Sequence, residues 1–389
     1  MGYLPISERD KRIAAVKQIM AAKDLDISLV YYDEFNIGNG WYLTGWCPQF
    51  ESGAVLIPRN GEPMVLGGPE SEPFAKLDSA ITETRNFPVF MVPDEEYPNA
   101  TIIDFPKLFA ELNGLLGQVK RVGMVGAGRM PQECYSQIVA GFTGCEMIDI
   151  TEEFLTLRYI KSDWELEQIA AGFALADLAH EAMFSAIKPG ASEIQVAAAG
   201  EYAVRSKGAT GFGFTAIVGS GARADAVVPT ASSKPLVDGE IVMVGLAPKV
   251  AGYNGVMGDS IAVSGKMTAE QADCYKFLKE ALRLTKAMLI PGKTGAEVDV
   301  PARALYAKHD MLKYIVCPFA HTIGLHEAEA PFFGPNSKDV IKPGMAICVD
   351  VSFFGHPTLY GARIETGYHI TENGPVPFSP KMDKWLTQD

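Results

Sequence analysis

The chain has 389 residues, of which 48% are hydrophobic, so it can form two or three domains with sizeable cores. Its formal net charge of −13 and sequence pI of about 5.0 argue against nucleic acid and anionic membranes as partners. Six dispersed cysteines without a Cys-x-x-Cys pair, no secretory signal and no apolar run of about 18 residues predict a soluble protein of the reducing cytoplasm.

The first 155 residues alternate predicted helices and strands. Strands are expected at 27–32 and 121–125, a hairpin at 53–68, and helices at 105–115 and 131–142. The hairpin turn contains Asn60-Gly61, a pair that is typical of tight turns. This pattern predicts a small α/β domain at 1–155.

An internal repeat organises the second predicted domain, 156–389. Long amphipathic helices at 164–188 and 269–289 each end in a Pro-Gly turn and are each followed by a second helix and then by β-like hairpins. Gly245 and Asp350 occupy matching positions, six residues after Gly239 and Gly344 respectively. Duplicated pairs of helices followed by strands predict a sheet with pseudo-two-fold symmetry, backed by helices.

Ionisable side chains fall on expected buried strands of this repeat. Asp350 ends the apolar run 346–349, and Glu365 interrupts a second β-like segment. A carboxylate in such a place is costly unless it is paired or bound to a cation. The repeat makes Asp259 equivalent to Glu365, so we expect the candidate catalytic and metal-binding residues to meet at the pseudo-two-fold axis: Asp259, His321, Asp350 and Glu365.

Structural roles are the competing interpretation of the same residues. In this interpretation His321 is a buried histidine bonded to the main chain, and Asp259, which follows a glycine, belongs to an Asx turn. Asp350 or Glu365 then pairs with Arg363 across the sheet. The four histidines at 180, 309, 356 and 369 are expected to be structural or exposed.

Several motifs resemble those of the creatinase, aminopeptidase P, prolidase and methionine aminopeptidase family, peptidase family M24. They cover most of the chain: Arg158-Tyr159-Ile160-Lys161-Ser162 with Glu165, Ile187-Lys188-Pro189-Gly190 with Glu193, Asp238-Gly239-Glu240, His321-x-x-Gly324, Lys342-Pro343-Gly344-Met345 and Arg363-Ile364-Glu365. The resemblance implies a mixed α/β protein. It would have a small creatinase-type N-terminal domain, a C-terminal pita-bread domain and a homodimeric assembly.

The resemblance also implies a set of metal ligands. Peptidases of the family carry two acids on the first strand pair, one histidine, and two acids on the second pair. The first acid falls here on Gly245, and the others fall on Asp259, His321, Asp350 and Glu365. The missing acid serves only one of two metals, so we expect at most one divalent cation, Mn²⁺, Fe²⁺ or Zn²⁺.

Two more departures concern histidines of the family pattern, which fall here on Val228 and Ala328. His326, two positions before Ala328, is a candidate substrate contact, and Arg363 a candidate for charge stabilisation. Further candidate substrate contacts follow from the repeat and from the family's N-terminal domain, which reaches a partner's active site: Tyr253, Tyr360, Phe50 and Glu51.

These residues predict a hydrolase that cleaves the C–N bond of a small amide, dipeptide or amidine. Asp350 would shuttle the proton of the attacking water. One alternative is metal-free hydrolysis of the creatinase type, with His321 and a carboxylate pair exchanging the proton. Others are a non-catalytic small-molecule binding protein and a lyase that abstracts a proton from a small zwitterion.

Overall fold

The computed structural model describes residues 4–388 and divides into two compact units, Met1–Arg158 and Tyr159–Asp389. The division lies three residues beyond the expected one, because helix α6 (Thr151–Thr156) continues past residue 155. Within the described part of the chain, no helix combines the length and the apolar character needed to cross a membrane.

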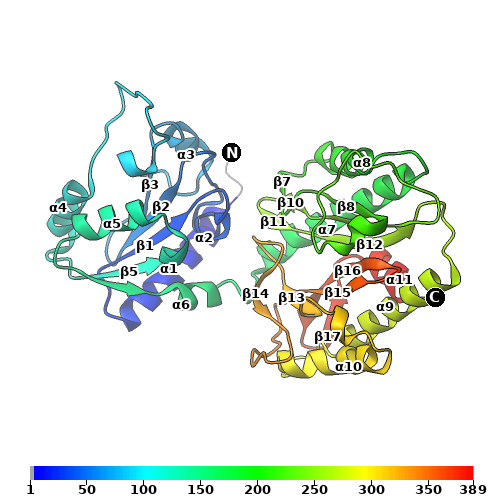
Figure 1. Ribbon diagram of the computed structural model, residues 1–389. Coiled ribbons are helices and arrows are strands. Elements are labelled where there is room, and N and C mark those ends of the chain that lie inside the picture. The colour runs from blue at the N-terminus through cyan, green and yellow to red at the C-terminus, as the bar shows by residue number, and fades with distance from the viewer. Residues whose placement is uncertain (1–3, 389) are drawn as a thin grey trace. The chain divides into compact units, whose positions relative to one another are not determined.

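The first unit is built on one sheet of six strands (Figure 1). Strand β1 lies inside it, antiparallel to β2 and parallel to β5. All six residues of β1 are buried, as expected for a strand with helices on both faces. The sheet order is β4 (Thr84–Asn86), β3 (Met64–Gly67), β2 (Gly53–Pro58), β1 (Ile27–Tyr32), β5 (Arg121–Val125) and β6 (Glu146–Asp149).

Five further helices complete this unit, and they lie against both faces of the sheet. Alternate residues of β1, among them Leu29 and Tyr31, share a core with Phe105 and Leu108 of α4. The intervening Tyr32 contacts Gly40 of α2 on the other face. The helices are α1 (Ile6–Ala22), α2 (Ile37–Thr44), α3 (Glu72–Asp78), α4 (Phe105–Leu116) and α5 (Gln132–Gly141).

The second unit contains the expected two-fold arrangement, an antiparallel sheet with β12 and β16 paired at its centre. Its order is β14 (Glu329–Phe332), β13 (Ala320–Thr322), β15 (Ala346–His356), β16 (Tyr360–Thr371), β12 (Met257–Ala262), β9 (Ile241–Leu246) and β8 (Ile217–Ser220), with β17 (Gly374–Pro377) beside β16. A small separate sheet joins β7 (Gly211–Phe212), β10 (Pro248–Val250) and β11 (Tyr253–Asn254).

The four repeat helices start alike in both halves. Each has a capping box, in which the side chain of the N-cap residue accepts a hydrogen bond from the main-chain N–H of the third helical residue. The side chain of that third residue in turn accepts from the main-chain N–H of the N-cap. The N-caps are Ser162 and Ser192 in the first half and Thr268 and Thr294 in the second. The helices are α7 (Asp163–Ala186), α8 (Glu193–Arg205), α9 (Ala269–Ala287) and α10 (Gly295–Lys308), followed by α11 (Pro380–Thr387).

Side-chain alternation along the strands assigns the two faces of this sheet. Val349, Val351 and Ile364 belong to the core that also contains Leu278 and Leu282 of α9. Because successive side chains of a strand point to opposite faces, Asp350 and Glu365 project away from that core. Asp350 was expected at the end of its strand, but β15 continues to His356, so Asp350 lies mid-strand.

Candidate functional site

The register of the central strands sets Asp350 and Glu365 side by side. Asp350 of β15 pairs with Glu365 of β16, Glu365 pairs with Gly258 of β12, and Gly258 pairs with Gly245 of β9. Directly paired residues of an antiparallel sheet project to the same face. This row therefore presents two carboxylates and then two glycines on the face opposite the helices.

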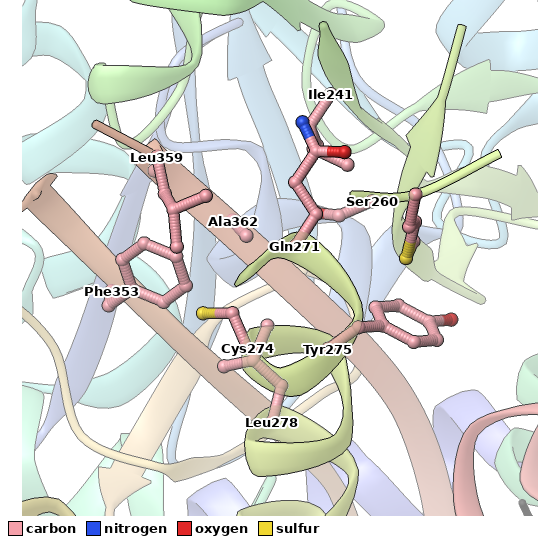
Figure 2. Close-up of a pocket in the computed structure, with 11 residues that line it drawn as sticks. Ile241, Ser260, Gln271, Cys274, Tyr275, Leu278, Phe353, Leu359 and Ala362 are labelled. Carbon is pink, nitrogen blue, oxygen red and sulfur yellow. The ribbon is translucent and has the colours of Figure 1, made fainter. Parts of the chain in front are cut away.

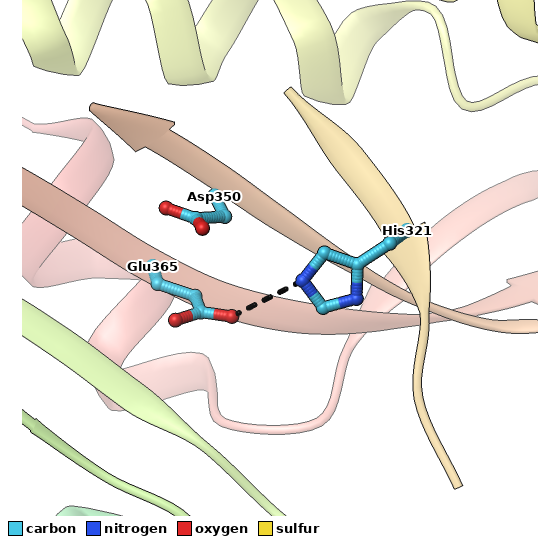
Figure 3. Close-up of side chains that lie close together, drawn as sticks. All are labelled: His321, Asp350 and Glu365. Atoms are coloured by element: carbon cyan, nitrogen blue, oxygen red, sulfur yellow. Dashed lines mark ion pairs between the residues drawn. The ribbon is translucent and has the colours of Figure 1, made fainter. Parts of the chain in front are cut away.

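His321 of β13 faces the two carboxylates (Figure 3). It pairs with Cys348, two residues before Asp350 and so on the same face. Its Nδ1 lies 3.1 Å from the carbonyl of Thr322, and since a carbonyl can only accept, Nδ1 carries the proton. Its Nε2 lies 3.6 Å from Oε1 of Glu365. Donor atoms of His321, Asp350 and Glu365 all lie within 4.8 Å of one another.

Arg363 supplies a buried positive charge beside Asp350. Its Nε donates to Oδ1 of Asp350 at 3.0 Å, and its Nη1 donates to the carbonyl of Val227 at 3.0 Å. The sequence left open a structural ion pair between Arg363 and either Asp350 or Glu365, and the structure contains this pair for Asp350. A Cβ placed on Gly258 would lie 3.3 Å from the Cδ of Arg363, so the arginine stem covers the glycine next to Glu365.

Glu327 joins this group, and the sequence interpretation missed it. It lies in the turn between β13 and β14, and its Oε1 is 3.8 Å from Nε2 of His321. No periodicity marks a turn residue as buried. The only sequence signal is that an acid follows His321 by six residues. The family's motif was aligned there with Ala328 and Glu329 instead.

The clustered charges shift the pKa values strongly. Burial and the neighbouring Glu365 raise the pKa of Glu327 to about 8. Burial, opposed by Arg363, raises the pKa of Asp350 to about 6. Burial alone would lower the pKa of His321, but Glu327, Glu365 and Asp350 raise it to about 10. Burial also opposes ionisation of Glu365, yet its contacts with His321 and Arg363 hold its pKa below the ordinary value.

Asp259 does not join the cluster, which corrects the expectation that all four residues meet. It follows Gly258 by one residue, so its side chain projects to the helix-covered face. There its Oδ2 accepts from Nε2 of His180 at 2.8 Å and from Nε1 of Trp385 at 2.9 Å. Its Oδ1 accepts from the hydroxyl of Tyr275 at 2.8 Å. Asp259 thus ties α7, α9 and α11 to β12.

Two hollows adjoin the partners of Asp259 on the helix-covered face. One is an open pocket of ≈890 Å³ lined in part by His180, Tyr275 and Trp385, and the other is a small internal cavity. The internal cavity has a volume of ≈20 Å³. Figure 2 shows residues that line it, among them Tyr275 and Cys274 of α9 and Ser260 of β12. A volume of this size holds about one water molecule. A substrate therefore cannot reach Asp259 from this cavity.

Three further candidate contacts lie outside the cluster. Tyr253 is buried and donates to Oε1 of Glu165 at 2.8 Å, a core role rather than a pocket-lining one. Tyr360 lies at the tip of the β15–β16 hairpin with φ of 61°. Glu51 of the first unit accepts from the main chain of Ser71 at 2.9 Å and from its hydroxyl, so its carboxylate is used to hold a turn.

The two remaining candidates have surroundings that neither support nor oppose a substrate contact. Phe50 is 78% exposed on the first unit and has φ of 65°. His326 is half-buried in the turn that carries Glu327, and its main-chain N–H lies 3.4 Å from Oε2 of Glu329. That turn is anchored by a buried ion pair, Lys161 Nζ to Glu329 Oε1 at 2.6 Å.

The side chains of the cluster could hold a divalent cation. One imidazole and two carboxylates lie within coordination range of a common point, and Oε1 of Glu365 is buried with no hydrogen-bond partner among the described residues. Nitrogen and oxygen donors of this kind suit Mn²⁺, Fe²⁺ or Zn²⁺. The strands β9 and β12 add no acid to this cluster, because Gly245 and Gly258 occupy the positions beside Glu365 and Asp259 faces the helices.

The lining of an open pocket of ≈560 Å³ includes Ala226 and Val228. These are the two sequence neighbours of Val227, whose carbonyl accepts from Arg363. The pocket is lined by the segment 222–230, including Arg223, Asp225, Val228 and Pro229. Val228, where the resemblance places a histidine, is 58% exposed.

Comparisons with protein families agree with this architecture. The model of "Metallopeptidase family M24" matches residues 167–372, and that of "Creatinase/Prolidase N-terminal domain" matches residues 12–160. The chain is 31% identical over 265 residues to the uncharacterized peptidase YqhT of Bacillus subtilis, which covers 68% of this chain and 74% of that protein. It is 29% identical over 289 residues to an Xaa-Pro dipeptidase of Pyrococcus furiosus, covering 73% and 82%.

Solved structures with the same fold extend over nearly the whole chain. The prolidase from Pyrococcus horikoshii superposes with a TM-score of 0.81 at 24% identity, covering 95% of this chain and 97% of that one. The X-Pro aminopeptidase from Thermotoga maritima superposes with a TM-score of 0.82 at 20% identity, covering 94% and 97%. At these identities the superpositions establish the fold, with a creatinase-type first domain and a second domain of the prolidase type.

Proposed function

The chain belongs to metallopeptidase family M24 and is a hydrolase of that family, and from this premise we propose that it cleaves the amide C–N bond of a dipeptide or of a similarly small amide. The observation that carries the proposal is the buried group of His321, Asp350 and Glu365 on the face of the sheet opposite the helices, called the open face below. The Xaa-Pro dipeptidases among its relatives support a dipeptide as the first substrate to test.

In this proposal the site holds a single divalent cation through His321, Asp350 and Glu365. When bound, such a cation polarises a carbonyl and lowers the pKa of water. The proton on Nδ1 of His321, held by Thr322, leaves Nε2 available as the nitrogen donor. The two glycines beside Glu365 account for a site with one cation rather than two.

Asp350 is the general base of the proposed reaction. In the cation-free cluster burial raises the pKa of Asp350 to about 6, which makes this carboxylate a better proton acceptor for the attacking water than an ordinary aspartate. The same carboxyl then passes that proton to the leaving nitrogen. The Arg363 guanidinium, 3.0 Å from Asp350, stabilises the negative charge that develops on the carbonyl oxygen.

A hydrolysis screen tests this proposal. The full chain, with one equivalent of Mn²⁺, would be assayed against Xaa-Pro dipeptides, other dipeptides, small amides and guanidino compounds, with product amines measured by mass spectrometry. We expect turnover of at least one dipeptide or amide, abolished in Asp350→Asn. Binding of a substrate without turnover would instead identify a non-catalytic binding protein.

Metal-free hydrolysis of the creatinase type is the second candidate, and the position of Arg363 favours it. The guanidinium already neutralises part of the charge of the acids, and His321, with its pKa near 10, is protonated at neutral pH. A protonated imidazole and a carboxylate could then exchange the proton without a cation. Activity that survives exhaustive chelation would select this mechanism.

We further propose a homodimer in the cytoplasm. The resemblance to the creatinase-type family implies the dimer, and the exposed Phe50 is the residue that would reach the partner's site. All six cysteines are free thiols, which suits a reducing compartment. Light scattering of the full chain, and of Phe50→Ser, would test the assembly.

A further inference from the structure

We propose that Glu327 is the fourth protein ligand of the cation site, so that the turn between β13 and β14 supplies a carboxylate that the strands β9 and β12 lack. This inference rests on the proposed function, because it adds one ligand to the same site. It replaces Asp259, which the sequence predicted for that place.

The distances around His321 match a coordination site better than a hydrogen-bonded cluster. Its Nε2 is 3.6 Å from Oε1 of Glu365 and 3.8 Å from Oε1 of Glu327. Both separations exceed the roughly 2.7–3.2 Å of a direct hydrogen bond. Two donors about 2.1 Å from one tetrahedral ion lie roughly 3.4 Å apart, close to the separations seen here.

The two carboxylate oxygens that face His321 also lack other partners. Oε1 of Glu327 and Oε1 of Glu365 are both buried, and neither has a hydrogen-bond partner among the residues that the structure describes. Glu365 itself is 3% exposed. Because a buried polar atom without a hydrogen-bond partner is costly, two such oxygens converging on one imidazole nitrogen fit a bound cation.

The other side of Glu365 cannot provide this ligand. Gly258 has no side chain, and a Cβ there would lie 3.0 Å from the Cβ of Glu365 and 3.3 Å from the Cδ of Arg363. The turn that carries Glu327 is instead held in place by the buried Lys161–Glu329 pair. A rigid support of this kind keeps a ligand in position before the ion arrives.

The proposed donor set is one imidazole and three carboxylates: His321, Glu327, Asp350 and Glu365. Donor atoms of His321, Asp350 and Glu365 lie within 4.8 Å of one another, and Glu327 joins them through its separations from His321 and Glu365. The charges of a divalent cation and of Arg363 together balance the three carboxylates. Cys348 lies within 4.8 Å of Glu327 and Glu365, but oxygen donors dominate the set, which favours Mn²⁺ or Fe²⁺ over softer ions.

Mn²⁺ affinity of chelator-treated full chain tests the assignment. Isothermal titration with MnCl₂ would compare wild type, Glu327→Gln and, as a matched control, Glu372→Gln, whose side chain is exposed on the same unit. We expect Glu327→Gln to weaken Mn²⁺ binding by at least about 10-fold, and Glu372→Gln to leave it unchanged. If Glu327→Gln is insoluble, Glu327→Asp takes its place with the same expectation of weaker binding.

The outcomes separate this inference from the proposed function. Wild-type Mn²⁺ affinity in Glu327→Gln would overturn the inference, because Glu327 would then only share a proton with Glu365. The single-cation hydrolase would survive that result. A wild-type chain that binds none of Mn²⁺, Fe²⁺ and Zn²⁺ would overturn both the cation site and the assignment of Glu327.

Discussion

Two buried carboxylate centres lie on opposite faces of one sheet, and they differ in how well their oxygens are satisfied. Asp259, on the helix face, accepts from His180, Tyr275 and Trp385 at 2.8–2.9 Å. Glu365, on the open face, keeps a buried oxygen without a hydrogen-bond partner among the described residues. The two residues belong to neighbouring strands and differ in register by a single position.

This contrast distinguishes a structural acid from a functional one. A carboxylate with a full set of donors stabilises the fold and has no capacity left for a ligand. A group of carboxylates with unsatisfied oxygens destabilises the fold until something binds there. The helix face should therefore control stability, and the open face should control chemistry.

The largest expected effect is on the open face. Asp350→Asn removes the proposed general base, so kcat/KM should fall by about 100- to 10,000-fold. Thermal melting would verify that the variant is folded, and steady-state hydrolysis of the best dipeptide would give the rate. Turnover at the wild-type rate would remove Asp350 from the mechanism.

The next effect is on the helix face. Asp259→Asn loses the charge that three side-chain donors share, so the free energy of unfolding should fall by roughly 2–4 kcal/mol. Urea denaturation measures the loss. Below the unfolding transition, kcat and cation stoichiometry should match wild type. A stable Asp259→Asn protein that has lost its cation would reverse the roles of the two faces.

A pH effect on stability should follow from the titratable residues of the open face. In chelator-treated protein Glu327 has a folded pKa of about 8 against an ordinary 4.5, and His321 about 10 against 6.5. The folded state then binds more protons than the unfolded state, so stability should fall as pH rises from about 5 to 9. Melting temperatures across this range should fall less steeply in Glu327→Gln. An equal slope in both proteins would contradict the assigned shift.

The smallest effect is expected at Tyr253. Tyr253→Phe removes one hydrogen bond to Glu165, so stability should fall by about 1–2 kcal/mol. Because Tyr253 lies in the core and not beside Glu365, KM and kcat should not change. A raised KM with unchanged stability would restore the pocket-lining role that the repeat had predicted.

The family, the fold class and the repeat could be predicted from sequence because their signals are local. Capping boxes begin the four repeat helices, and the Pro-Gly turns precede the second helix of each half. These features depend on residues only a few positions apart, so they can be recognised in the sequence without knowledge of the tertiary structure. Both the fold class and the family are confirmed by the comparisons.

The error at Asp259 has a simple geometric origin. The repeat compares 14 residues from Gly245 to Asp259 with 15 from Asp350 to Glu365. In the first half, the excursion through β10 and β11 breaks the regular count between the strands. Since a shift of one residue moves a side chain to the other face, the true counterpart of Glu365 in the row is Gly258.

The position of Glu327 beside His321 could not be predicted from the sequence, for a different reason. It lies in an irregular turn, where no helical or strand period indicates burial. Its position depends on the distant contact between Lys161 and Glu329, which are 168 residues apart in sequence. Only the folded structure brings such a turn beside His321.

One titration tests the contrast between the faces most directly. Wild type, Asp259→Asn and Glu365→Gln, all freed of metal, would be titrated with Mn²⁺ and the bound ion counted after equilibrium dialysis. The account predicts one ion per chain in wild type and in Asp259→Asn, and none in Glu365→Gln. Two ions in wild type, or loss of the ion in Asp259→Asn, would contradict it.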